Sequence, residues 1–188
     1  MRDSILKIIN SHRTLVDDLE NNHVDTLVRC ADAMASCLQE GGCIYICGNG
    51  GSAADAQHIA GELVGRFQRN RKAFAAVALT TDTSVMTAVA NDFAYEDVFA
   101  RQVEALVGRG DLLWAFSTSG TSANILKAVD GARQKGAVIV SFTGRAASPL
   151  EARSDFCLCA SSESTARSQE IHQLAYHIIC GLIEERCA

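Results

Sequence analysis

Two side chains that can bind a metal ion or move a proton stand four residues apart, at His58 and Glu62. Residues at this spacing lie on the same face of a helix, so the imidazole and the carboxylate can act on one ligand. Ile59, Leu63 and Val64 make the same stretch mostly apolar, which argues against a fully solvated ion pair. The spacing therefore favours a functional site, with a surface i,i+4 pair as the alternative.

A flexible glycine turn at 48–52 (Gly-Asn-Gly-Gly-Ser) leads into this helix. It follows the apolar run 43–47, which is typical of a strand buried on both faces. The glycines can adopt positive φ and let a ligand approach the backbone. Ser52 suits the helix N-cap, where free N–H groups favour an anionic or hydroxyl-rich ligand. Many turns contain glycine for steric reasons, so this turn alone leaves ligand binding and packing equally open.

A second strand–turn–helix pattern carries hydroxyl groups. The apolar run 112–116 leads directly into Ser117, Thr118, Ser119, Gly120, Thr121 and Ser122. Hydroxyls and backbone N–H groups at a helix start can bind a phosphate without a lysine, although such a turn more often serves only as an N-cap. Its expected position at the same sheet edge as the glycine turn favours phosphate binding.

Alternating strands and helices must position these turns. Hydrophobic periodicity predicts helices at 4–20 and 24–39, then at about 52–66, 83–90, 95–106, 122–135 and 165–185. Strands are predicted at 43–47, 75–79, 112–116, 137–142 and 155–159. This order indicates βαβ units, a mostly parallel sheet with helices on both faces, and ligands at the carboxyl ends of the strands.

Polar groups enter the otherwise apolar pattern of the predicted C-terminal helix, at Gln169, Glu170, His172 and His177. Gln169 and His177 are eight residues apart, roughly 12 Å along a straight helix. Both side chains must therefore lean inwards to bind one ion. A single histidine on an apolar face is more often a hydrogen-bonded core residue than a ligand, and we predict that role for His172.

The composition fits one domain of ordinary size, with 188 residues and 48% hydrophobic content. The formal charge is -5 and the basic residues are scattered, so no electrostatic footprint for nucleic acid or an anionic membrane is present. No apolar run approaches the roughly 20 residues that span a bilayer, and charged residues interrupt the N-terminal segment. We therefore predict a cytoplasmic protein.

Eight cysteines raise the question of metal binding or disulfides. They stand at 30, 37, 43, 47, 157, 159, 180 and 187, without C-x-x-C spacing. Free cysteine is among the most often buried residues, so we predict mainly buried structural thiols.

Five motifs in this order resemble the bacterial phosphoheptose isomerases, which are sedoheptulose 7-phosphate isomerases of the sugar-isomerase (SIS) domain group. The motifs are the glycine turn at 48–52, His58 with Glu62, Asn91 with Asp92, the hydroxyl-rich turn at 117–122, and Gln169 and Glu170 with His177. The resemblance covers residues 24–185. The ordered set is far more specific than any one motif.

The resemblance implies a three-layer, flavodoxin-like α/β SIS fold with a mostly parallel five-stranded sheet. It implies a single domain over 1–188 whose N-terminal helices, at 1–40, serve in packing and oligomerisation. It also implies a homotetramer with active sites at subunit contacts and a sugar phosphate as the small-molecule partner.

The resemblance further implies one zinc ion (Zn2+) per subunit, held by His58, Glu62, Gln169 and His177. Histidine and carboxylate are ordinary zinc ligands, while a glutamine oxygen is less usual. The residues that match the family's substrate contacts are Asn49, Gly50, Gly51, Glu62, Asn91, Asp92, Ser117, Thr118, Ser119, Ser122 and Gln169.

A ketose-to-aldose conversion moves a proton between adjacent carbons through an enediol. By similarity Glu62 is the base and His177 the acid, while zinc polarises the carbonyl. A zinc-bound carboxylate is a poorer base, so Glu62 acts as ligand, as base, or as both in alternation. The predicted function is conversion of sedoheptulose 7-phosphate to D-glycero-D-manno-heptose 7-phosphate, in heptose and surface-glycan (lipopolysaccharide) biosynthesis.

Two alternatives remain open. One is a non-catalytic SIS-fold protein that binds the replication initiator, a subgroup that lacks the carboxylate and histidine matching Glu62 and His177. The other is an isomerase of another sugar phosphate. The chain departs from the family pattern at 69–74, at Ala146 with Ala147, and at Ala166, where some members carry an aspartate near the sugar. These departures concern the sugar more than the reaction type.

Overall fold

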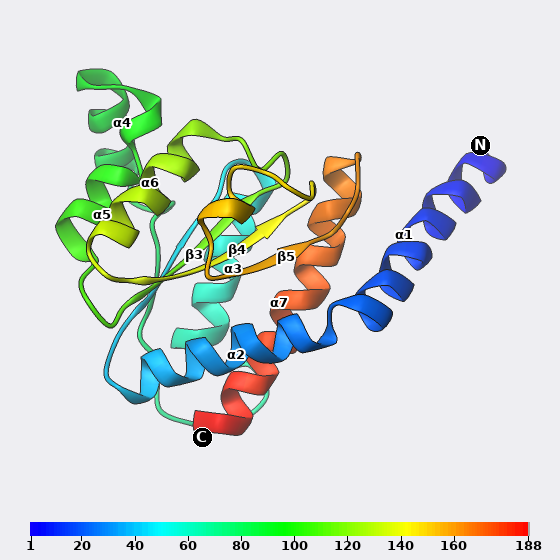
Figure 1. The fold of residues 1–188 in the computed structure, drawn as a ribbon, viewed down its shortest axis with the longest axis horizontal. Coiled ribbons are helices and arrows are strands. Elements are labelled where there is room, and N and C mark those ends of the chain that lie inside the picture. The colour runs from blue at the N-terminus through cyan, green and yellow to red at the C-terminus, as the bar shows by residue number, and fades with distance from the viewer. Residues whose placement is uncertain (188) are drawn as a thin grey trace.

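The short apolar runs form one parallel sheet in the computed structural model, which describes residues 1–187 (Figure 1). The strands are β1 (Ile44–Cys47), β2 (Ala76–Ala78), β3 (Leu112–Ser117), β4 (Val138–Thr143) and β5 (Phe156–Cys159). Their order in space is β2-β1-β3-β4-β5, and neighbouring strands pair in parallel. Every residue of β3 is buried, as expected for the central strand of a covered sheet.

Helices cover both faces of the sheet. One face packs against α2 (Val24–Gln39), α3 (Gly51–Val64) and α7 (Thr165–Cys187), and the other packs against α5 (Ala100–Leu106) and α6 (Ala123–Gln134), with α4 (Thr83–Asp92) beside them (Figure 1). Alternate side chains of β3 enter the two cores, Trp114 on the first face and Leu113 on the second. The predicted three-layer α/β architecture is confirmed.

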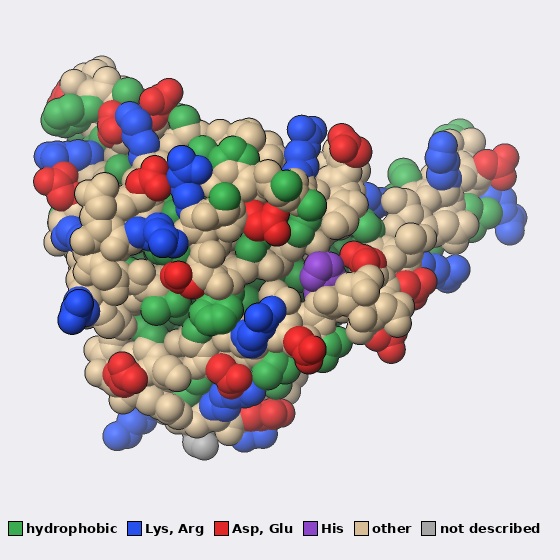
Figure 2. Space-filling model, viewed as in Figure 1, with side chains coloured by type: hydrophobic (Ala, Val, Ile, Leu, Met, Phe, Trp, Pro, Cys, Tyr) green, Lys and Arg blue, Asp and Glu red, His purple; other side chains and the backbone are tan. Residues whose placement is uncertain are grey.

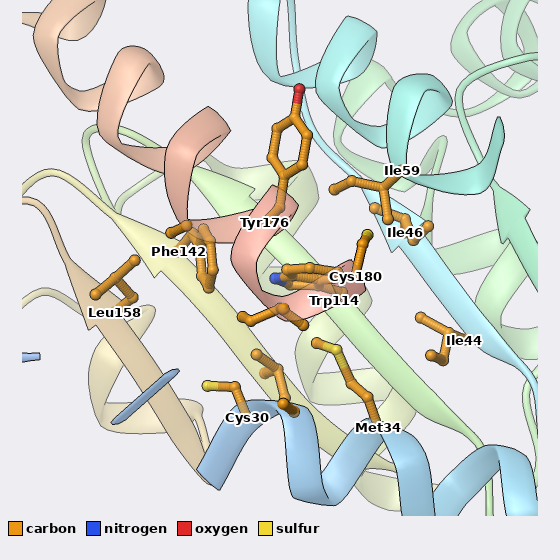
Figure 3. Close-up of a cluster of buried hydrophobic side chains, with 14 of the residues drawn as sticks. Cys30, Met34, Ile44, Ile46, Ile59, Trp114, Phe142, Leu158, Tyr176 and Cys180 are labelled. Carbon is orange, nitrogen blue, oxygen red and sulfur yellow. The ribbon is translucent and has the colours of Figure 1, made fainter. Parts of the chain in front are cut away.

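Large aromatic side chains fill the first core. The rings of Trp114, Phe116 and Phe142 lie with centroids 5.1 to 5.4 Å apart, and all three are fully buried. Figure 3 shows Trp114 and Phe142 of this cluster beside the sheet, with Met34 and Cys30 of α2 beneath them. Each such aromatic pair contributes about 0.5–1.5 kcal/mol beyond the burial of its area.

The segment between α4 and α5 differs from the prediction. We predicted one helix over 95–106, whereas the structure has a 3-10 turn η1 (Tyr95–Asp97) followed by α5 from Ala100. The break lets the adjacent side chains of Val98 and Phe99 both enter the second core. A further 3-10 turn, η2 (Glu151–Arg153), was not predicted.

The first helix, α1 (Arg2–Asn22), extends away from the sheet (Figure 1). Its second half packs on the first core through Leu15, Val16 and Leu19. Its first half leaves four large apolar side chains exposed, those of Ile5, Leu6, Ile8 and Ile9. No helix within residues 1–187 has both the length and the apolar character to cross a bilayer.

The eight cysteines are free thiols in the structure. Cys30, Cys37, Cys47, Cys159 and Cys180 are buried, which confirms the structural prediction for these five. Burial raises the pKa of the Cys47 thiol to about 12. Such a thiol stays protonated at neutral pH and is therefore inert as a nucleophile or metal ligand.

A buried ion pair holds the end of α3 against α7. The Glu184 carboxylate accepts hydrogen bonds at 2.9 Å from the backbone N–H groups of Phe67, Gln68 and Arg69, and one at 3.0 Å from Arg71 Nε. The side chains of Arg71 and Glu184 are only 3% and 2% exposed. Arg71 also donates to the carbonyl oxygens of Leu63 and Glu62 at the end of α3. Together these bonds fix the lengthwise position of α3 relative to α7.

We expect Glu184→Ala to lower the free energy of unfolding by about 3–5 kcal/mol, because it leaves the Arg71 charge buried without its partner. Burial alone raises the pKa of Glu184, but the backbone N–H groups and Arg71 outweigh it and lower the pKa below 4.5. The contribution is therefore present above about pH 4.5 and is lost as the pH falls through the folded-state pKa. Urea denaturation at neutral and acidic pH measures both effects.

The neighbouring exposed Glu185 provides the control. Glu185→Ala should change the stability by less than about 0.5 kcal/mol. Equal losses in the two variants would contradict the assigned role of Glu184.

Candidate active site

The two turns singled out in the sequence meet at the carboxyl ends of β1 and β3. These strands are neighbours, and the chain leaves β1 towards β2 on one side and β3 towards β4 on the other. Such a switch point creates a crevice at the sheet edge. A cavity of about 270 Å³ lies there, lined by Asn49, Gly50, Gly51, Ser52, Phe116, Ser117, Thr118, Ser122, Thr165 and Gln169. We refer to it as the anion cavity.

Glycine is required in the two turns that meet at the anion cavity. Gly50 has φ +57° and Gly120 has φ +67°, a region that other residues rarely adopt. A Cβ at Gly120 would also lie 2.3 Å from the Cβ of Ser148. At Gly51 a Cβ would collide with the Gln169 amide, so the backbone of the turn and this side chain are in direct contact.

Hydroxyl and N–H groups dominate the polar lining. Ser117 Oγ lies 2.9 Å from Ser122 Oγ and 3.3 Å from Ser119 Oγ. The N-termini of α3 and α6 both begin at this edge. Within residues 1–187 the lining of the anion cavity includes no lysine or arginine. An anion placed here would meet helix N-termini and hydroxyls, the kind of site that the sequence predicts for a phosphate.

Two asparagines connect the turns. Asn49 Nδ2 donates to Asn124 Oδ1 at 2.9 Å, and Asn124 Nδ2 donates back to Asn49 Oδ1 at 2.8 Å. The Tyr95 hydroxyl donates to the same Asn49 oxygen at 3.1 Å. Sequence reasoning missed Asn124 and Tyr95 because no local pattern shows which residues from separate turns will pair. The side-chain oxygen of Asn49 thus accepts two hydrogen bonds, and its amide nitrogen donates one of its two hydrogens.

The predicted pair on α3 meets His177 of α7. His58 Nε2 lies 3.0 Å from Glu62 Oε1 and 3.4 Å from His177 Nε2. Ligand atoms of the three residues all lie within 4.8 Å of one another, as a metal site requires. Neighbouring ligand atoms of a tetrahedral zinc are about 3.3 Å apart at ordinary bond lengths, so this donor set fits the ion. We call these residues the His–Glu–His cluster.

Surroundings keep the His177 imidazole neutral. Its desolvation lowers the pKa below 6.5, the nearby His58 lowers it further, and Glu62 opposes the change. The ring of Phe67 stacks on it at 5.6 Å between centroids. A neutral imidazole has a free lone pair, which both a metal ligand and a proton acceptor need.

Gln169 lies at the other end of the groove between α3 and α7. Its amide contacts Gly51, which precedes His58 by seven residues, or about 10 Å along the helix. In one subunit it therefore belongs to the anion cavity, whereas His177 belongs to the His–Glu–His cluster.

Asn91 and Asp92 stand exposed at the end of α4, where Asn91 Nδ2 donates to Asp92 Oδ1 at 2.7 Å. Neither residue lines the anion cavity.

The predicted core role of His172 is confirmed. The side chain is fully buried, and its Nε2 lies 3.2 Å from the Thr143 carbonyl oxygen, to which it donates. Its Nδ1 has no hydrogen-bond partner in the described chain. The ring packs against Phe116 and Phe142. His172 thus supports the end of β4 beside the hydroxyl-rich turn and touches no ligand itself.

The chain matches the SIS domain family model over residues 8–144. It is 47% identical to a phosphoheptose isomerase of Roseiflexus sp. (strain RS-1) over 171 residues, which cover 89% of this chain and 87% of that protein. A solved phosphoheptose isomerase from Neisseria gonorrhoeae superposes with a TM-score of 0.93 at 39% identity, covering 98% of both chains. A second, from Francisella tularensis, gives 0.94 at 34% identity over 97% of both.

A parallel sheet with an anion cavity at its switch point, together with this family match, defines an isomerase built on the SIS domain. Within that class the identities and coverages are high enough to assign the group. The chain belongs to the phosphoheptose isomerases.

We expect Asn124→Ala to weaken the binding of inorganic phosphate about tenfold, because one lost hydrogen-bonded pair is worth roughly 1–1.5 kcal/mol. The variant frees the two turns from each other and leaves the Asn49 amide without its partner. Isothermal titration with phosphate measures the change. The exposed Asn70→Ala is the control. Unchanged affinity in Asn124→Ala would show that the asparagine pair does not shape the anion cavity.

Stability should fall on acidification through His172. Burial lowers its pKa to about 4, although the hydrogen bond to Thr143 opposes this. Between about pH 6.5 and 4 the histidine binds a proton in the unfolded chain but stays neutral in the folded protein. This difference lowers the free energy of unfolding by up to about 3 kcal/mol. Urea denaturation at pH 7 and 4.5 should show a smaller pH dependence for His172→Gln than for the parent. An equal pH dependence in the two proteins would contradict the cost assigned to burying His172.

Proposed function

We propose that this protein converts sedoheptulose 7-phosphate to D-glycero-D-manno-heptose 7-phosphate in heptose and surface-glycan biosynthesis. The observation that carries the proposal is the position of the anion cavity and the His–Glu–His cluster along the same two helices, about 10 Å apart along α3. A long open-chain sugar with a terminal phosphate spans such a distance. The names of the relatives support the same reaction.

The phosphate binds in the anion cavity, where Ser117, Thr118 and Ser122 and the backbone of Gly50 and Gly51 face it. Ser119, bonded to Ser117, orients that hydroxyl. Binding at one end places the carbon chain along the groove between α3 and α7. Such positioning supplies a large part of the rate enhancement, because the reacting carbons are held beside the catalytic groups.

Glu62 and His177 perform the proton transfers. Glu62 takes the proton from the carbon next to the carbonyl and returns it to the neighbouring carbon, while His177 exchanges protons with the two oxygens. His177 is kept neutral by its surroundings, so it can accept a proton at physiological pH. Glu62 is only partly exposed, which limits its access to water. The role of Glu62 as ligand, base or both remains part of the proposal.

Zinc is the proposed metal, with one ion per subunit. His58, Glu62 and His177 would hold it, since three acceptor atoms converge there within ligand distance of one another. When bound, the ion would polarise the substrate carbonyl. Gln169 is the fourth proposed ligand. Its amide lies at the Gly51 end within one subunit, so this chain alone assembles the first three members of the set.

A homotetramer with active sites at subunit contacts accounts for two further features. The apolar side chains on the first half of α1 are exposed in the single chain and need a partner. Asn91 and Asp92 lie exposed at the end of α4 and do not line their own anion cavity, so they would meet the sugar of a neighbouring subunit. On the face shown in Figure 2, acidic and basic side chains are intermixed. The absence of a nucleic-acid partner stays a prediction. A cytoplasmic location stays a prediction.

With zinc and sedoheptulose 7-phosphate, the purified protein should form the aldose heptose phosphate. Glu62→Gln and His177→Ala should each lower kcat by at least about 100-fold, because each removes a group that transfers a proton. Gln57→Ala, on the exposed side of the same helix, should retain full activity. Product formation is followed by chromatography of the sugar phosphates.

Turnover of a pentose or hexose phosphate in place of the heptose would overturn the proposed substrate. Absence of all turnover, together with initiator binding by the protein carrying both substitutions, would favour the non-catalytic alternative. The presence of both Glu62 and His177 in one cluster disfavours that alternative.

A further inference from the structure

The imidazole of His177 is only weakly oriented by its own position on α7. The residue is partly exposed, and χ2 of histidine is a broad torsion that rotamer preference alone leaves loosely fixed. Within residues 1–187 the side chain has one hydrogen-bond contact, the 3.4 Å approach of its Nε2 to His58 Nε2, which is too long to orient a ring strongly. An imidazole that must meet the rest of the His–Glu–His cluster in one geometry therefore needs a further restraint.

The ring of Phe67 supplies this restraint. It lies nearly parallel to the His177 imidazole, at an interplanar angle of 13° and 5.6 Å between centroids. The rings of His58 and Tyr176 are instead inclined to that imidazole by 76° and 67°. Such a stacked ring covers part of one imidazole face. Rotation of the imidazole about its Cβ–Cγ bond would turn its edge towards the phenyl ring, so the stack favours the observed plane.

Phe67 is itself anchored to α7, the helix that carries His177. Its backbone N–H donates to Glu184 Oε1 at 2.9 Å, and Glu184 stands seven residues after His177, or about 10 Å along the helix axis. The phenyl ring lies over Gly181, where an added Cβ would be 3.7 Å from Phe67 Cε1, and it packs against the first core. The phenyl ring and the imidazole that it covers are therefore held on one helix.

We propose that Phe67 is a positioning residue that fixes the plane of the His177 imidazole and so keeps its Nε2 within reach of the other two members of the His–Glu–His cluster. The inference rests on the proposed function in its consequences for turnover and zinc, but the restraint on the ring is a property of the chain itself. A phenyl ring suits this task, because it contacts the imidazole through its face and has no donor or acceptor that competes for the Nε2 lone pair.

Phe67→Leu and Phe67→Tyr test the proposal. The first keeps an apolar side chain but removes the flat ring, whereas the second keeps the ring. In metal-free protein with 13C-labelled histidine, Phe67→Leu should lower the NMR order parameter of the His177 ring C–H bonds, and Phe67→Tyr should leave it at the parent value. Zinc affinity, measured by competition with a chromophoric chelator, should fall about 2- to 10-fold in Phe67→Leu alone, which is the size of one aromatic pair.

Turnover separates positioning from substrate binding. Phe67→Leu should lower kcat for the heptose phosphate about 2- to 10-fold and leave KM unchanged, because the anion cavity is intact and only the placement of a proton-transfer group is lost. Phe156→Leu is the matched control. It removes another partly buried phenyl ring from the first core, on the edge strand β5 that contacts α2, and should leave the order parameter, the zinc affinity and kcat at parent values.

A merely structural role for Phe67 would lower the melting temperature of Phe67→Leu and Phe156→Leu alike and leave the order parameter and the zinc affinity of both at parent values, which would overturn the proposal. A raised KM with unchanged kcat would overturn it as well, since the ring would then act on the sugar. If the parent binds no zinc or converts no heptose phosphate while the His177 ring loosens in Phe67→Leu, the positioning role stands and the proposed function fails. The two failures are thus distinguishable.

Discussion

The alignment of α3 with α7 is the constraint on which the site depends. His58 and Glu62 come from one of these helices and His177 from the other, more than a hundred residues later. A slip of one helical turn would move His177 by about 5 Å and separate ligand atoms that now lie within 4.8 Å of one another. The buried Glu184 and Arg71 prevent such a slip at the end of α3, and the contact between Gly51 and Gln169 does so at its start. Both ends of the groove are therefore fixed independently of the chemistry between them.

Strand order supplies the second half of the site. Because the chain leaves β1 and β3 in opposite directions across the sheet, the two turns that follow them face each other with no helix between. The pairing of Asn49 with Asn124 then joins the turns directly. On this basis a chain of net charge -5 can still offer a local site for an anion. Helix N-termini and hydroxyls act over a few ångströms, whereas the overall charge acts on approach.

Much of this arrangement was predictable because its signals are local. Short apolar runs predicted the strands to within one or two residues, and the spacing of His58 and Glu62 predicted their common face. Contacts between segments that are distant in the sequence could not be predicted from local patterns. Only the family resemblance linked His177 to this pair, because no periodic pattern connects the two segments. Nothing in the sequence linked Asn124 to Asn49 or Glu184 to Arg71. The split of the 95–106 helix was also missed, because burial of Val98 and Phe99 is decided by the second core.

Gln169 and His177 show that one helix, α7, contributes side chains to both the anion cavity and the His–Glu–His cluster. Gln169 lies eight residues before His177, so a straight α7 cannot bring both side chains to one ion without distortion. In the structure the Gln169 amide instead contacts the backbone of the glycine turn at Gly51. Within a subunit the helix therefore presents one polar group to the anion cavity and another to the His–Glu–His cluster. Tyr176, which precedes His177, faces the core and meets His58 from the opposite side. Successive residues of α7 thus approach the same imidazole from its two nitrogens, and this requires both α3 and α7 to be rigid where they touch.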